Sequence, residues 1–282
     1  MIIEIKNDFL GVKINTLGAE IKSIKTNGEE RLHQPNEIWE DQSPVLFPIC
    51  GTPTGNKITV DGVDYPMTAH GFAMFSEFEL VNQTETSATF LLVSSAETKK
   101  SYPYDFEFYV TYTLDESSID VCYEVKNKSI GAMYFSVGCH EGYLCPEGLS
   151  AYELHFEKAE PKNPFICEGR RPIENGFSIV DGHSVHKLTD ELFTDSITVV
   201  YDSPVSEYVV LKNTLSGRET KIYFKDFDHL LMWTEPGADF VCIEPWCGMS
   251  AFGLPCNDIS EKNGIHKLEE NGTYEVHHII TF

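Results

Sequence analysis

The sequence predicts an all-β protein, a large antiparallel β-sandwich with few short helices. Apolar side chains occupy every second position from Phe106 to Leu114, and the alternation resumes from Ile119 to Val125 after the polar turn at residues 115–118. This period of two is typical of half-buried strands, and the short turn between the runs predicts an antiparallel hairpin. Strand-like runs do not alternate with long helical runs, so a doubly wound parallel sheet is not favoured.

Further strands are expected wherever β-branched and aromatic residues form short runs that end at Gly, Asn, Asp or Pro. These runs are residues 2–5, 11–15, 19–26, 86–94, 197–201, 208–213, 219–224 and 274–282. Residues 37–42 and 189–193 have the pattern of a single helical turn. The sequence contains no fixed-period repeat and no low-complexity linker, so we expect residues 1–282 to form one domain, with residues 142–176 as a long excursion over the sheet.

The charge balance argues against two classes of partner. The chain has 282 residues, with 21 Lys and Arg against 44 Asp and Glu, which gives a formal net charge of −23. A protein that binds the nucleic acid backbone needs clustered cations, and the longest basic clusters here are pairs. The same charge disfavours an anionic membrane surface, and no apolar stretch approaches the roughly 20 residues that cross a bilayer. We therefore expect neither nucleic acid nor a membrane as partner.

The N-terminus and the cysteines indicate the compartment. Glu4 and Asp8 stand where a signal peptide would have a basic start and an apolar middle, so export by that route is not expected. Eight cysteines are spread along the chain without dense spacing, and 41% apolar residues can build a core without disulfides. We expect a cytoplasmic protein whose thiols are reduced and mostly buried.

Two histidines stand at interruptions of the strand pattern. In residues 65–72, which follow the segment 47–51, His70 precedes a glycine that lets the backbone approach a ligand closely. In residues 134–143 an apolar strand ends at His140, and a strand end is a rigid platform for a catalytic group. Taken alone, each histidine is more often structural, in a turn or a loop.

A carboxylate in a third segment completes the set of candidates. Glu244 directly follows the apolar run 240–243, which predicts a buried strand. A carboxylate in apolar surroundings either finds partners or has its pKa raised, and a raised pKa suits a general base that works near neutral pH.

No metal site is expected from the spacing of cysteines and histidines. Cys-x-x-Cys pairs are absent, and His277 and His278 cannot bind one ion together because adjacent strand residues face opposite sides. The sequence also lacks phosphate-binding glycine loops and a Gly-x-Ser-x-Gly nucleophile motif.

Together these segments resemble the aldose 1-epimerase (galactose mutarotase) family, especially its bacterial branch of LacX-like proteins. The resemblance spans nearly the whole chain and rests on Phe47–Gly51, His70–Ala73, Val137–His140 and, above all, Cys242–Gly248. It implies a galactose mutarotase-like supersandwich of antiparallel strands, with an open cleft on one sheet and a small-molecule sugar as partner. It also implies chemistry that needs no cofactor and no metal.

The resemblance assigns roles by position. It implies that His140 is the general acid, that Glu244 is the general base and that His70 holds the sugar. Interconversion of α and β anomers removes the proton of the C1 hydroxyl and delivers one to the ring oxygen, so one base and one acid suffice. Each such group is worth roughly 10² to 10⁴ in rate.

Further substrate contacts are expected from two other segments. Relatives often carry a substrate-binding aspartate in the segment that matches residues 192–196, where either Asp195 or Ser196 occupies the position; we take Asp195. Trp246 is expected to offer its ring to a sugar face, and the other candidates for such a platform are Trp233, Phe72 and Tyr143.

The sequence departs from the family pattern at two positions. Thr52 stands where many relatives have an arginine, and Glu141 stands where a proline commonly follows the acid histidine. We expect Glu141 to add negative charge near the mouth of the site and to discourage a phosphorylated ligand.

The leading hypothesis is a mutarotase for a neutral aldose, and the sequence does not determine the sugar or the oligomeric state. One alternative is a sugar-binding protein of the same fold without turnover. The other is a hexose-6-phosphate 1-epimerase, which requires cations near the site. The candidate cations are Arg170, Arg171, Arg218 and Lys225.

Overall fold

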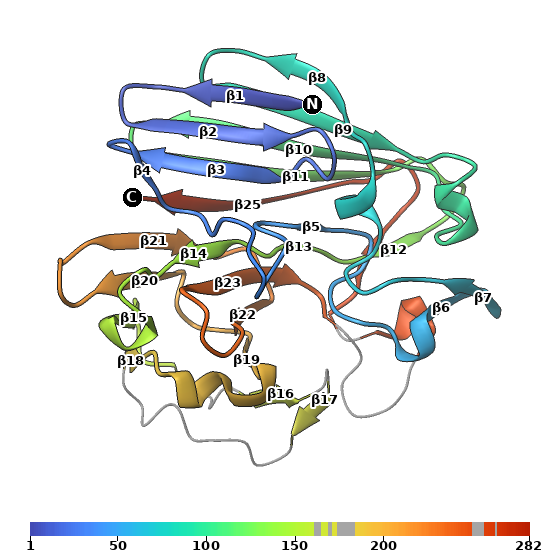
Figure 1. Ribbon diagram of the computed structural model, residues 1–282. Helices are drawn as coiled ribbons and strands as arrows, with labels where there is room; N and C mark the ends of the chain where they lie inside the picture. Colours follow the sequence, from blue (N-terminus) through green and yellow to red (C-terminus); the bar gives the residue numbers. More distant parts are fainter. Residues whose placement is uncertain (161–164, 169–170, 174–183, 250–256, 263) are drawn as a thin grey trace.

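The computed structural model describes residues 1–160, 165–168, 171–173, 184–249, 257–262 and 264–282, without the side chains of residues 165–168, 171–173 and 194–196. Within this part the predicted all-β fold is confirmed: antiparallel strands dominate, and the helices are single short 3-10 segments (Figure 1). No helix among the described residues is both long and apolar enough to cross a bilayer.

The N-terminal sheet, as described, contains four strands in chain order. They are β1 (Ile2–Lys6), β2 (Leu10–Asn15), β3 (Ile21–Thr26) and β4 (Glu29–Glu30). β1 buries Ile3 and Ile5 and exposes the residues between them, as its alternation predicts. The side chain of Asn7 accepts the N–H groups of Phe9 and Leu10, at 2.9 and 2.8 Å, and so forms the turn into β2.

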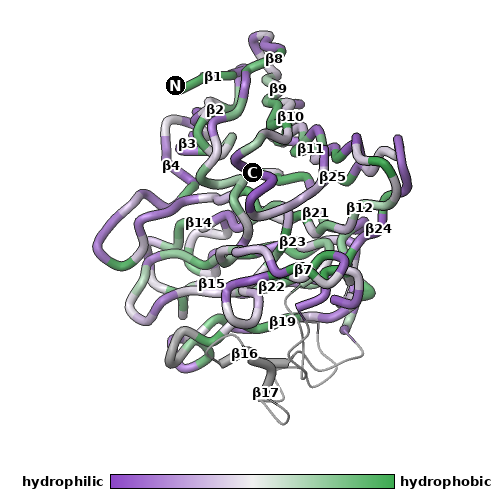
Figure 2. Tube along the Cα trace, turned by 90° about the vertical axis from the view of Figure 1, so that its right-hand side faces the viewer, coloured by the Kyte–Doolittle hydropathy of each residue, from purple (hydrophilic) through white to green (hydrophobic). Residues whose placement is uncertain are grey.

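A long sheet crosses the molecule and has nine strands in the described part of the chain. In spatial order they are β18 (Val185–Lys187), β15 (Tyr152–Phe156), β20 (Tyr208–Asn213), β21 (Glu219–Tyr223), β25 (Thr273–Thr281), β11 (Ser118–Asn127), β10 (Phe106–Asp115), β9 (Ser87–Val93) and β8 (Glu79–Gln83). The predicted hairpin is confirmed, since β10 pairs with β11 from Phe106 opposite Asn127 to Asp115 opposite Ser118. Buried residues alternate with more exposed ones along β10 and β11, and Figure 2 shows hydrophobic and hydrophilic residues interspersed along the chain trace.

A third sheet carries the candidate site, and we call it the site sheet. Its described strands, in spatial order, are β17 (Arg171–Ile173), β16 (Phe165–Glu168), β19 (Thr198–Asp202), β22 (His229–Trp233), β23 (Phe240–Cys247), β13 (Val137–Cys139) and β5 (Val45–Leu46), with β14 (Gly142–Leu144) also paired to β23. β23 is buried along its whole length, and in its first half Phe240 and Cys242 join one apolar cluster while Val241 and Ile243 join another.

Small elements complete the described fold. The remaining strands are β6 (Lys57–Val60), which pairs with β7 (Val63–Pro66), and β12 (Met133–Phe135), which pairs with β24 (His266–Leu268). The 3-10 helices are η1 (Thr54–Asn56), η2 (Ala73–Phe75), η3 (Thr98–Lys100), η4 (Leu149–Ala151), η5 (Asp190–Ser196) and η6 (Ile259–Glu261).

Of the two predicted helical turns, one is confirmed and one is wrong. η5 covers the turn predicted at residues 189–193, whereas residues 37–42 form bends. The side-chain oxygen of Asn36 accepts the N–H groups of Ile38 and Trp39, at 2.8 and 3.1 Å, and this local bonding competes with a helical turn.

The long sheet is the shared back layer of the sandwich. The N-terminal sheet covers one half of it and the site sheet the other half (Figure 1). The Tyr112 hydroxyl of β10 donates to the carbonyl of Ala19 at 2.7 Å, and the Tyr201 hydroxyl of β19 lies 3.2 Å from Nδ1 of His186 in β18. Both contacts are buried, so they tie the layers together while satisfying polar groups in the core. The cysteines whose side chains are described are free, and five of these six are buried.

Candidate active site

Two neighbouring strands hold His140 and Glu244 side by side. β13 and β14 flank residues 140–141, and both pair with β23 in one continuous register that places His140 level with Glu244. Cross-strand neighbours on one face of a sheet lie close together. Nε2 of His140 is 3.4 Å from Oε2 of Glu244. The structure thus brings together the two residues that the sequence predicts as acid and base, and we call them the acid–base pair.

Burial controls the charge of the acid–base pair. The side chain of His140 is 13% exposed and that of Glu244 is 1% exposed. Burial, and next the neighbouring His70, lower the pKa of His140 to about 3. Burial, and next the Glu141 carboxylate, raise the pKa of Glu244 well above its usual range. Both shifts favour the uncharged forms of the two side chains.

The acid–base pair has polar atoms left for a ligand. Among the described residues, neither Nδ1 of His140 nor Oε1 of Glu244 has a hydrogen-bond partner, although both are buried. Buried polar groups are nearly always hydrogen-bonded, so such atoms indicate a place where another molecule binds. A protonated carboxyl beside a neutral imidazole offers a proton donor and a proton acceptor at one point.

His70 joins the acid–base pair from the segment after β7. Its backbone N–H donates to the carbonyl of Gly51 at 2.8 Å, and its Nδ1 accepts the Gly51 N–H at 3.2 Å. Because Nδ1 accepts a hydrogen bond, the ring proton of the neutral imidazole is on Nε2. The His70 ring centre lies 5.6 Å from that of His140 and 5.5 Å from that of Trp246.

Two glycines permit the close packing of these segments. Gly71 has a φ of +79°, and a Cβ on it would lie 2.2 Å from the carbonyl oxygen of Phe47. A Cβ on Gly138 would lie 2.7 Å from Cδ1 of Trp246, so the indole packs directly on the backbone of β13. The indole N–H donates to the carbonyl of Cys139 at 3.0 Å. A contact between Trp246 and a substrate therefore remains a prediction for its ring.

Two tryptophans lie on the other side of His140. The ring centres of Trp39 and Trp233 are 5.4 and 5.5 Å from that of His140 and 5.6 Å from each other. Trp233 was among the candidate platforms, but the sequence analysis did not assign Trp39 to the site. The sequence did contain a signal for Trp39, because it is a large aromatic residue in a polar segment between two prolines. Such a segment is a loop, and loops held by a rigid scaffold often carry functional residues.

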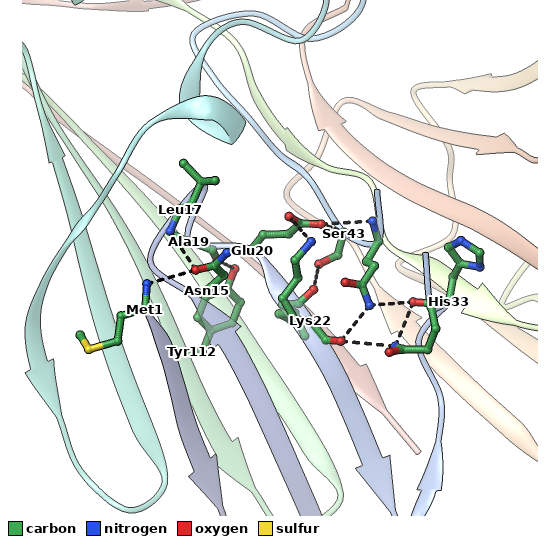
Figure 3. A network of polar contacts seen from close by, with 12 residues as sticks. Met1, Asn15, Leu17, Ala19, Glu20, Lys22, His33, Ser43 and Tyr112 are labelled. Carbon is green, nitrogen blue, oxygen red and sulfur yellow. Dashed lines mark hydrogen bonds and ion pairs between the residues drawn. The ribbon is translucent and has the colours of Figure 1, made fainter. Parts of the chain in front are cut away.

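The segment that carries Trp39 is anchored to the N-terminal sheet (Figure 3). The carboxylate of Glu20 accepts the backbone N–H groups of Gln42 and Ser43, at 3.1 Å each, and pairs with Lys22 at 2.7 Å. The Gln42 side-chain amide donates to the carbonyls of Lys22 and His33, at 2.8 and 3.0 Å. These bonds fix both ends of the segment, so the tryptophan approaches the site from a rigid base.

The expectation that Glu141 lies at the mouth of the site is wrong. Glu141 is 2% exposed, and its carboxylate oxygen lies 3.2 Å from Nε2 of His278 in β25, inside the sandwich. Adjacent residues of a strand face opposite sides, so the residue after His140 points away from the site. Glu141 therefore presents no charge to a ligand at the mouth.

Two of the other candidate aromatic platforms for a sugar, Tyr143 and Phe72, pack against the core. Tyr143 is 2% exposed and faces the core, and Phe72 packs against Phe47 and Tyr102 at ring distances of 6.3 Å. Asp195 belongs to η5, but its side chain is outside the described part, so its role stays a prediction.

Of the cations proposed for a phosphosugar, the two whose side chains are described, Arg218 and Lys225, pair with carboxylates. Arg218 contacts Glu29 and Glu147 at 3.5 and 3.8 Å, and Lys225 contacts Glu207 at 3.1 Å. Arg170 and the side chain of Arg171 lie outside the described residues.

A supersandwich that holds a histidine and a carboxyl together on one sheet defines a class of proteins equipped for acid–base chemistry. The chain belongs to the aldose 1-epimerase family, since the sequence profile described as aldose 1-epimerase matches residues 1–252.

The named relatives agree with this membership. The chain is 33% identical over 286 aligned positions to the chromosomal protein LacX of Lactococcus lactis subsp. lactis, with 95% of each chain covered. It is 30% identical to a galactose mutarotase related enzyme of Lactobacillus acidophilus, with a TM-score of 0.94 and coverage of 100% of this chain and 97% of the other. A galactose mutarotase-like protein of Lactobacillus casei, 24% identical with a TM-score of 0.91, shares the fold over 100% and 99% of the two chains.

Proposed function

We propose that the protein is an aldose 1-epimerase that interconverts the α and β anomers of a neutral aldose. The observation that carries the proposal is the 3.4 Å separation of His140 Nε2 and Glu244 Oε2. In a cyclic aldose the C1 hydroxyl and the ring oxygen are bonded to the same carbon. The group that removes a proton from one oxygen and the group that protonates the other must therefore lie side by side, as this pair does.

The proposed reaction uses the pair in both directions. Glu244 removes the proton of the C1 hydroxyl while His140 protonates the ring oxygen, and the bond from C1 to the ring oxygen breaks to give the open aldehyde. Rotation about the C1–C2 bond turns the other face of the carbonyl toward the ring hydroxyl, and closure exchanges the two roles. The proposal requires that His140 is protonated and Glu244 is ionised when the sugar is bound, the reverse of the forms that the directions of the two pKa shifts favour without it. The pair ends each cycle with one proton, as it began.

The surroundings of the pair support an uncharged sugar. Trp39 and Trp233 offer ring surfaces next to His140, and aromatic rings pack on the apolar faces of sugars. The ring of His70, oriented by the bond at Nδ1, lies 5.6 Å from that of His140 and in this proposal contacts the sugar. Among the described residues, no Lys or Arg contributes to the pKa shifts of the pair. These described neighbours therefore offer a phosphoryl group no positive charge from Lys or Arg.

The test follows the optical rotation of freshly dissolved α-glucose, α-galactose and a panel of other aldoses. The expected result is that the wild-type protein accelerates mutarotation of at least one sugar, whereas Glu244→Gln does not. Glu124→Gln, a half-buried carboxylate on β11 that pairs with Lys126 at 2.9 Å, is the matched control and is expected to retain the rate.

Absence of acceleration with every sugar would contradict the proposal. Titration calorimetry on the same samples then separates the remaining alternatives. Saturable heat with an aldose but no acceleration identifies a sugar-binding protein without turnover, and acceleration confined to a hexose 6-phosphate identifies the phosphosugar epimerase.

A further inference from the structure

A second set of polar side chains lies behind β13, on the face opposite to the acid–base pair. Cys139, Glu141 and Tyr143 occupy alternate positions along residues 139–143, and His278 faces them from β25 of the long sheet. We call these four residues the interior cluster. Their exposed fractions are 0%, 2%, 2% and 0%. The donor atoms of Cys139, Glu141 and His278 all lie within 4.8 Å of one another.

The interior cluster contains unusually many unsatisfied polar atoms. Among the described residues, Oε2 of Glu141, the Tyr143 hydroxyl and both ring nitrogens of His278 lack a hydrogen-bond partner. Nε2 of His278 is only 3.2 Å from Oε1 of Glu141, yet the two are not aligned as a hydrogen bond. Each buried polar atom left without a partner costs about 1–3 kcal/mol. Several at one point therefore indicate a group that binds there.

We propose that Cys139, Glu141 and His278 bind a divalent metal ion, zinc by the chemistry of the three donors, which links the site sheet to the long sheet. Thiolate, carboxylate and imidazole are the three side chains that zinc uses in proteins. Two ligands about 2.1 Å from a tetrahedral zinc ion lie about 3.4 Å apart, close to the 3.2 Å between the carboxylate and imidazole. Ligands that converge on an ion point at it and not at each other, which fits the poor alignment of the two.

The charges of the site balance. A Cys139 thiolate and a Glu141 carboxylate together neutralise one divalent cation, so the core gains no net charge. Binding replaces the thiol proton by the metal and releases that proton to solvent.

Three other groups of potential ligands in the described chain differ from the interior cluster. In the group Asp228, Cys247 and His266, the Asp228 carboxylate already accepts from His266 at 2.9 Å. The thiols do not distinguish the two groups, since Cys247 lies 3.1 Å from the Tyr274 hydroxyl and Cys139 donates to the Pro245 carbonyl at 3.6 Å. In the group Cys122, Glu275 and His277, the histidine is 40% exposed and bonded to carboxylates on both nitrogens. The group His140, Cys242 and Glu244 contains the acid–base pair.

None of the ligands of the proposed metal site faces the acid–base pair, although the Glu141 carboxylate contributes to the raised pKa of Glu244. Its test measures metal content and does not depend on the proposed function. The spacing rules used on the sequence could not find the proposed metal site. They search for ligands close together in the chain, whereas residues 139–141 and 278 meet only after two sheets pack face to face.

The test measures the metal content of the full-length protein by inductively coupled plasma mass spectrometry. The protein is unfolded with a chelator present, refolded with a small excess of Zn²⁺ and desalted. About one zinc ion per chain is expected for the wild type, and less than about one tenth of that for Cys139→Ser and for His278→Gln. Cys242→Ser and His266→Gln, which alter the other buried groups, are the controls and are expected to retain the ion.

A second measurement does not depend on the folding of the variants. The wild type refolded with Co²⁺ in place of Zn²⁺ is expected to show a thiolate-to-cobalt charge-transfer band that excess Zn²⁺ abolishes. The proposal is overturned if the refolded wild type holds less than about one tenth of an ion per chain. It is also overturned if folded Cys139→Ser and His278→Gln keep a full ion, or if His266→Gln alone loses it.

Discussion

The same stretch of chain contributes to two histidine–carboxylate pairs that differ in their surroundings. His140 and Glu244 lie 3.4 Å apart with the histidine 13% exposed, whereas His278 and Glu141 lie 3.2 Å apart with side chains 0% and 3% exposed. The two pairs lie on opposite faces of residues 139–141. His140 therefore belongs to one candidate site, and the adjacent Cys139 and Glu141 belong to the other. Distance and residue type do not distinguish the two pairs. What separates them is the partial exposure of His140, at 13%, against the complete burial of His278.

The largest effect is expected when either member of the acid–base pair is replaced. Glu244→Gln or His140→Asn is expected to lower kcat/KM for mutarotation by about 10²–10⁴-fold, because each variant removes one proton-transfer group. The two groups act as a unit, so the double variant should be only slightly slower than the worse single variant. Polarimetry with Glu124→Gln as control checks this. Retention of more than about half of the rate in both single variants would contradict the assigned roles.

A smaller effect is expected where the strand between the pairs is disturbed. In Gly138→Ala the new Cβ would meet the Trp246 ring at 2.7 Å, and relief of this overlap moves either the indole or β13. The free energy of unfolding, from urea titration, should fall by about 1–3 kcal/mol. Gly11→Ala is the control, because a Cβ there meets no atom within 4 Å. Equal stability of the two variants would show that the indole packing is more tolerant than described.

Removal of an aromatic neighbour is expected to affect binding more than turnover. Trp39→Ala should raise KM by up to about tenfold with a smaller change in kcat, because it removes a ring surface but no proton-transfer group. The neighbouring Ile38 is 42% exposed, and Ile38→Ala should leave both constants unchanged. If Trp39→Ala lowered kcat alone, the tryptophan would be placing His140 and not the sugar.

A further prediction concerns the dependence of stability on pH. The pKa of Glu244 is raised on folding, so above the ordinary carboxyl range the folded protein binds more protons than the unfolded chain, and stability falls as pH rises toward the folded pKa. Glu244→Gln cannot titrate, so its stability relative to the wild type should increase from pH 5 to pH 8, by at most about 1.4 kcal/mol per pH unit. Parallel urea titrations check this, and a difference independent of pH would contradict the raised pKa.

The pKa of His140 acts in the opposite direction. Its folded pKa of about 3 lies below that of a free histidine, so the unfolded chain binds more protons below about pH 6.5. Stability should therefore decrease as pH falls from about 6.5 toward 3, and His140→Asn should weaken this acid dependence.

The fold could be predicted because period-two alternation is a local property. The hairpin at 106–125 and the C-terminal strand follow directly from the identity of successive residues. The site was reached through family motifs around His70, His140 and Glu244. The segment 37–42 was mispredicted because a side chain, Asn36, holds the backbone groups that a helical turn needs.

Features that depend on packing between distant segments could not be predicted from the sequence. The inward direction of Glu141 follows from a register that both flanking strands share with β23. The approach of Trp39 to His140 depends on bonds from Glu20 to the far end of its segment. Neither fact is written in any one stretch of sequence.

The place of β25 in the long sheet affects how the chain folds. This strand, residues 273–281, is inserted between β21 and β11, so the middle of the back layer is filled by the last part of the sequence. During synthesis β21 and β11 are made before β25, so each has an unpaired edge until β25 is inserted between them. Pairings between such distant segments form slowly, and exposed edges invite association with other chains. We therefore expect the nascent chain to depend on protection from aggregation until β25 has left the ribosome.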